Sequence, residues 1–129
     1  MRTEWCRAFP GVAGEVAQAR HFVASLVAGH ASVDDAVLVV SELATNAVRH
    51  SLSGALGGWF LVVVGFEDDL VRIEVIDQGG DREPHLCDVT DQEEGGRGLL
   101  LIAGCAKDWG VENWPDRRSV WADLAREGV

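Results

Sequence analysis

Glu42-Leu43-Ala44-Thr45-Asn46-Ala47 is the part of this 129-residue chain that says most about its architecture. It lies in a segment whose apolar residues recur every three or four positions, a spacing that predicts a helix from Val33 to about His50. Ser32 stands before the helix as an N-cap, with Asp35 three positions later in an approximate capping box. On a helical wheel one broad arc holds the apolar residues Val33, Ala36, Val37, Val40, Leu43, Ala44, Ala47 and Val48.

Glu42 and Asn46 are four positions apart on this helix, so their side chains project next to each other and can share one ligand. A carboxylate can orient or deprotonate an attacking hydroxyl, and an amide oxygen is a hard ligand suited to Mg²⁺. The helical pattern alone favours the simpler alternative that both side chains only face solvent. Leu38 falls among the polar residues, which indicates that this face of the helix is partly covered.

The remaining elements are predicted in the order strand, helix, hairpin, loop, short helix and second hairpin. Their ranges are 3–9, 15–27, 59–66 with 70–77, 78–96, 98–106, and 107–111 with 119–124. The second hairpin turns at Pro115-Asp116. Because no repeat or linker interrupts this order, residues 1–129 are expected to form one domain. The aperiodic loop over 78–96 is a candidate lid, since compact domains seldom keep such loops without a function.

Asp77 ends the predicted strand over 70–77 on the same face as Val71, Ile73 and Val75. An ionised carboxylate on an apolar face is costly unless it is paired, so Asp77 is expected to meet a donor such as an amide or the amino group of a base. A carboxylate that caps the turn at Gly79-Gly80 is the alternative, and both interpretations stay open at this point.

The run Gly95-Gly96-Arg97-Gly98 precedes the short helix predicted over 98–106. Backbone amides at a helix start form an anion site, and glycine leaves that site sterically open. Arg97 can add a forked contact to a phosphate. A flexible hinge is the alternative for a lone glycine run. The chain contains no P-loop motif and no dinucleotide-binding motif after a strand, so neither of those nucleotide folds is supported.

These three segments resemble the N, G1 and G2 boxes of the GHKL superfamily, the ATP-binding fold of gyrase, histidine kinases and a heat-shock chaperone. More narrowly, residues 41–51 and 95–99 are similar to the small anti-sigma factor serine kinases and their actinobacterial relatives. The resemblance spans nearly the whole chain. It implies an α+β two-layer sandwich with helices packed on one face of a mixed, mostly antiparallel sheet.

The resemblance also implies a role for each matching residue, with ATP and Mg²⁺ as cofactors. Glu42 would be the general base, Asn46 the Mg²⁺ ligand, Asp77 the acid that binds the adenine amino group, and Gly79 the turn beside the base. The implied phosphate-binding loop contains Gly96, Arg97, Gly98 and Leu99.

Two positions near the implied base site differ from the usual pattern of these relatives. Ser119 stands where they usually have a threonine near the adenine. Asp81 replaces the second glycine of the G1 box, a change that would alter lid flexibility or weaken binding.

By resemblance, the chain would be a protein serine/threonine kinase that phosphorylates an anti-anti-sigma protein and binds a sigma factor. Homodimers are common in that family. One alternative is a domain that holds nucleotide without turnover and sequesters a protein partner, and another is an apo scaffold whose boxes persist for folding. Glu42 argues against pure degeneracy of the site.

Composition excludes several other classes of protein. A formal net charge of -10 and a pI near 4.6 argue against direct binding of nucleic acid, which requires clustered Lys and Arg. The longest apolar stretch, 59–66, is far shorter than the ~20 residues of a membrane span, so a cytoplasmic protein is expected. Cys6, Cys87 and Cys105 match neither a disulfide framework nor a zinc site, and reduced, partly buried thiols are expected.

Overall fold

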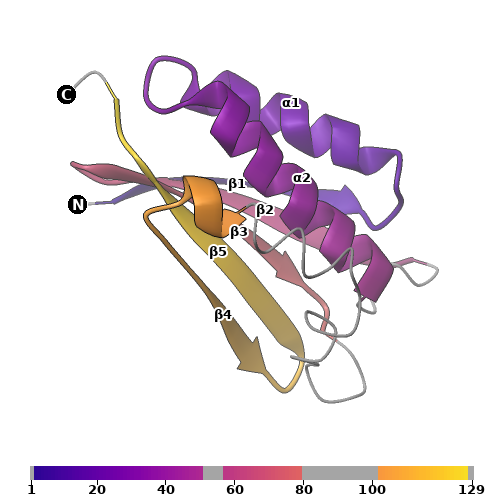
Figure 1. The fold of residues 1–129 in the computed structure, drawn as a ribbon. Helices are drawn as coiled ribbons and strands as arrows, with labels where there is room; N and C mark the ends of the chain where they lie inside the picture. Colours follow the sequence, from indigo (N-terminus) through magenta and orange to yellow (C-terminus); the bar gives the residue numbers. More distant parts are fainter. Residues whose placement is uncertain (1, 51–56, 80–101, 128–129) are drawn as a thin grey trace.

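The computed structural model describes residues 2–50, 57–79 and 102–127, in which two long helices cover one face of a sheet (Figure 1). The elements in chain order are β1 (Thr3–Pro10), α1 (Glu15–Val27), α2 (Val33–His50), β2 (Trp59–Phe66), β3 (Leu70–Asp77), β4 (Asp108–Trp114) and β5 (Arg117–Ala125). The predicted α+β two-layer sandwich is confirmed.

The described strands form one five-stranded sheet in the order β1-β2-β3-β5-β4, and each neighbouring pair is antiparallel. β3 lies in the middle, between β2 and β5. Its last residue, Asp77, is directly opposite Phe60 of β2 and Arg118 of β5. Because directly paired residues project from the same face of a sheet, this register brings the side chains of Asp77 and Arg118 together.

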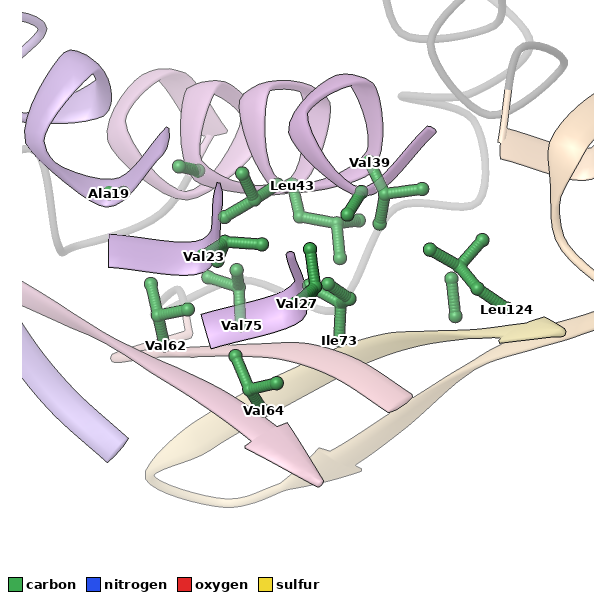
Figure 2. Close-up of a cluster of buried hydrophobic side chains, with 14 of the residues drawn as sticks. Ala19, Val23, Val27, Val39, Leu43, Val62, Val64, Ile73, Val75 and Leu124 are labelled. Carbon is green, nitrogen blue, oxygen red and sulfur yellow. The ribbon is translucent and has the colours of Figure 1, made fainter. Parts of the chain in front are cut away.

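The core lies between the two helices and the sheet, as Figure 2 shows. Both helices and the three inner strands contribute to it: Ala19, Val23 and Val27 of α1, Val39 and Leu43 of α2, Val62 and Val64 of β2, Ile73 and Val75 of β3, and Leu124 of β5. Each valine, leucine or isoleucine side chain of this set contributes about 1.5–3 kcal/mol when fully buried. Phe9 and Phe60 also belong to this core, and their rings stack with centroids 5.5 Å apart.

Helix α2 begins where the sequence predicts, and the backbone N–H of Asp35 donates to the Ser32 hydroxyl at 3.2 Å. The apolar arc is only partly as expected. Val39, which the wheel left out, is fully buried, whereas Val37 is half-buried. The buried arc is wider because α2 packs against α1 as well as the sheet.

Four elements keep their predicted bounds, and the others differ at their ends. β1 extends through Pro10, and β4 and β5 are longer than predicted because their ladder continues up to the Pro115-Asp116 turn. Of the predicted helix over 98–106, residues 102–105 are helical. Residues 80–101 lie outside the described part of the chain, and with them most of the candidate lid.

Two observations bear on the expectations about thiols and membranes. Cys6 is exposed rather than partly buried, because it lies on the edge strand β1 and projects from the sheet face opposite to Phe9. Cys105 is partly buried, as expected, and Cys87 lies outside the described residues. Among the described residues, no helix is long and apolar enough to cross a membrane.

Candidate functional site

Asp77 is the buried acid of the central strand. Burial alternates along β3, so that Val71, Ile73, Val75 and Asp77 are buried while Arg72, Glu74 and Ile76 are partly exposed. The alternation confirms the prediction that Asp77 shares the core-facing side of its strand. Only 2% of the residue is exposed, so its carboxylate needs compensating donors.

Two groups supply those donors from different sides. The backbone N–H of Gly79 donates to Oδ1 of Asp77 at 2.7 Å. From β5, Nε and Nη2 of Arg118 both donate to Oδ2, at 3.2 Å and 2.9 Å. The turn-capping interpretation of Asp77 is thus confirmed, the second oxygen is paired with the guanidinium of Arg118, and the contact with a base stays a prediction.

Burial raises the pKa of the Asp77 carboxyl above its ordinary value. The charge of Arg118 opposes this rise, and so do the hydrogen bonds from Gly79 and Arg118. The ionised form thus depends on these two neighbours, since desolvation by itself favours the neutral acid.

Gly79 makes the turn that supplies one of these donors. Its φ angle is +68°, in the left-handed region that side chains with a β-carbon rarely adopt. A β-carbon at this position would meet the backbone of Arg117 at 3.5 Å from its Cα, an ordinary contact distance. The need for glycine therefore comes from the backbone angle, not from lack of space.

The hydrogen bonds leave a defined capacity for a ligand. A carboxylate offers about four lone-pair positions, two on each oxygen. In the described part of the chain, Oδ2 receives two hydrogen bonds and Oδ1 receives one. Counted over the described residues, Oδ1 of Asp77 thus keeps one acceptor position, and the exocyclic amino group of adenine is a donor of the kind that such an oxygen accepts.

Glu42 and Asn46 lie in the C-terminal half of α2, and both are half-buried, as is Leu38. This agrees with the expectation that the polar face of the helix is partly covered. In Figure 1 the C-terminal end of α2 and the end of β3 lie toward the same end of the molecule.

The described residues contain no group of three or more His, Cys, Asp or Glu side chains that could hold a metal ion. Mg²⁺ is commonly held by one or two protein ligands together with substrate phosphates and water. The single amide oxygen of Asn46 fits that pattern.

Ser119 is placed on the other side of the sheet. It pairs with Ile76 rather than Asp77, it is fully buried, and its hydroxyl donates to the carboxylate of Glu74. The side chains of Ser119 and Asp77 are thus not brought together. The phosphate-loop residues Gly96, Arg97, Gly98 and Leu99 lie outside the described residues, as does Asp81.

Arg118 is the site residue that the sequence pattern did not reveal. Its signal is the cross-strand register, since Arg118 is 41 positions from Asp77 and meets it only when β3 pairs with β5. If β5 is placed beside β3 in this register, Arg118 falls opposite Asp77, and this juxtaposition is the signal that points to the pair.

The two-layer fold, with a buried, hydrogen-bonded acid and a glycine turn at the end of the central strand, agrees with the sandwich that the resemblance implies. A family model of the histidine kinase-like ATPase domain matches residues 9–123. The chain belongs to this family. A comparison with curated proteins finds no match. Family membership supports a role as an ATP-binding regulatory domain.

Proposed function

We propose that this domain is a Mg-ATP-dependent protein serine/threonine kinase of the anti-sigma factor type. The observation that carries the ATP part is the buried Asp77 carboxylate, which has acceptor capacity left on Oδ1 beside the Gly79 turn. The family match over residues 9–123 supports the same part. The kinase part is supported by Glu42, half-buried one helical turn from Asn46.

Each part of the nucleotide has a candidate partner in the chain. Asp77 and Gly79 would hold the adenine, and Asn46 would hold Mg²⁺, which neutralises phosphate charge when it is bound. The phosphates would contact the backbone amides of Gly96, Gly98 and Leu99 and the guanidinium of Arg97, as the resemblance implies. Such positioning and charge neutralisation are most of what phosphoryl transfer requires.

In the transfer step, Glu42 accepts the proton of a serine or threonine hydroxyl on the protein partner. The hydroxyl oxygen then forms a bond to the γ-phosphorus of ATP. The bond between that phosphorus and the β,γ-bridging oxygen breaks, and ADP leaves with the electron pair. An anti-anti-sigma protein is the proposed phosphoacceptor, a sigma factor the proposed regulated partner, and a homodimer the proposed assembly.

Transfer of labelled γ-phosphate to a candidate anti-anti-sigma protein tests the kinase proposal. We expect the wild type to label the partner and Glu42→Ala to lower the rate by about a hundredfold, as loss of a general base does. Asp34→Asn, an exposed carboxylate change on the same helix, is the matched control and should keep the wild-type rate. Equal rates for Glu42→Ala and wild type would remove Glu42 as the base. ATP binding without any transfer would favour sequestration of a partner over catalysis.

A further inference from the structure

We propose that Arg118 is a positioning residue that holds Asp77 as an ionised acceptor and so sets the preference of the base site for 6-amino purine nucleotides over 6-oxo purine nucleotides. The proposal concerns the base site alone and rests on the ATP-binding part of the proposed function. Arg118 would act through Asp77, without touching the reacting phosphate.

Arg118 contacts only one of the two carboxylate oxygens of Asp77. Nε and Nη2 of Arg118 both donate to the same oxygen, Oδ2, and the side chain of Asp77 is only 3% exposed. Gly79 fixes the other oxygen from the turn. Hydrogen bonds to both oxygens therefore fix the orientation of the carboxylate group. Among the described residues, its remaining acceptor position is on Oδ1. Charge-assisted hydrogen bonds of this kind are stronger than neutral ones and hold a defined orientation.

Arg118 is also the cation that compensates Asp77. The residue opposite on β2 is the apolar Phe60, and the C-terminal half of α2 carries the charged residues Glu42 and Arg49. On β5, the neighbouring Arg117 is exposed and its guanidinium lies over the Trp114 ring. In the described part of the chain, Arg118 is thus the charged group that opposes the effect of burial on Asp77.

The protonation state of this carboxyl decides which base it can bind. An ionised carboxylate accepts the N–H of a 6-amino group and repels a 6-oxo group, whereas a neutral carboxyl can donate its O–H to the 6-oxo group. Without Arg118, burial would act unopposed by a cation and the pKa of Asp77 would rise further. The base preference would then weaken as the pH falls.

The test compares wild type, Arg118→Met, Arg118→Lys and the matched control Arg117→Met. Calorimetry gives the affinities for Mg-ATP and Mg-ITP as a function of pH, from just above the ordinary aspartate pKa up to neutral pH. At the acidic end we expect Arg118→Met to lose about tenfold in ATP affinity and to gain relative affinity for ITP. Arg118→Lys should recover part of the wild-type profile, because it restores the charge but not the fork. Arg117→Met should match wild type.

A second readout needs no nucleotide. Carbon-detected NMR follows the Asp77 carboxyl directly, and its titration should move to higher pH in Arg118→Met than in wild type. Wild-type titration and an unchanged ATP-to-ITP ratio in a folded Arg118→Met protein would overturn the role of Arg118 while leaving ATP binding intact. If wild type binds neither nucleotide, the proposed function fails and the base preference fails with it.

Discussion

Substituting Gly79 with alanine perturbs the site through the backbone alone. At a φ angle of +68° a residue with a β-carbon costs about 1–2 kcal/mol, and part of this is offset because alanine restricts the unfolded chain. The new β-carbon meets the Arg117 backbone at 3.5–3.6 Å, which adds no clash. The backbone angle by itself is therefore expected to lower the free energy of unfolding of Gly79→Ala by about 1 kcal/mol.

The same substitution should weaken ATP binding for a separate reason. Relief of the strained angle turns the Gly79 N–H away from Oδ1 of Asp77, which it contacts at 2.7 Å. The Asp77 carboxylate then loses the donor that fixes the orientation of Oδ1, and we expect ATP affinity to fall about tenfold. Gly29→Ala is the matched control, since Gly29 has a φ angle of +82° and a β-carbon added there would have no atom within 4 Å.

Urea unfolding and calorimetry with Mg-ATP measure the two effects on the same preparations. Gly79→Ala should lose more stability than Gly29→Ala, because it also loses the hydrogen bond to Asp77, and only Gly79→Ala should lose ATP affinity. If Gly29→Ala weakens ATP binding as much as Gly79→Ala does, the effect is global, and the reasoning about the Gly79 turn is refuted.

Two further predictions concern the buried charges of the sheet. Arg72 donates to both carboxylate oxygens of Asp123, at 2.7 Å and 2.9 Å, so Arg72→Met should cost about 3 kcal/mol in urea unfolding by leaving a buried charge unpaired. Adding Asp123→Asn should recover part of that loss, and full additivity would contradict the pairing. Because the folded pKa of Asp77 is raised, its stabilising contribution is present below the ordinary aspartate pKa and is lost as pH rises through the folded value. Asp77→Asn should therefore gain stability relative to wild type in thermal unfolding as the pH rises through the raised folded pKa of Asp77, and a difference that stays constant with pH would exclude a raised pKa.

Periodicity in the sequence predicts those elements that bury one face. The bounds of α1, α2, β2 and β3 follow from it, because a shift in any of them would turn apolar side chains toward solvent. The inward orientation of Asp77 follows for the same reason. A helical wheel predicts the buried face less well when a helix packs against several elements. Val39 is buried outside the predicted apolar arc because α2 packs against both α1 and the sheet.

Features that depend on strand pairing could not be predicted from local pattern. The Asp77–Arg118 pair joins residues 41 positions apart, and the extent of the β4–β5 ladder depends on its register. Ser119 matches the threonine of the relatives only by its position in the sequence. The direction of its side chain is set by the pleat of β5, which places the hydroxyl beside Glu74. The roles of Glu42, Asn46 and the glycine loop stay predictions.

The central claim is that Asp77 forms the base contact of an ATP site. Isothermal calorimetry with Mg-ATP on wild type and Asp77→Asn tests it most directly, with thermal unfolding as a check that both proteins are folded. We predict saturable binding to the wild type and a loss of about tenfold or more in Asp77→Asn, since the amide offers fewer acceptor positions and no charge. Equal affinities, or neither binding heat nor a thermal shift for wild type at millimolar nucleotide, would contradict the claim.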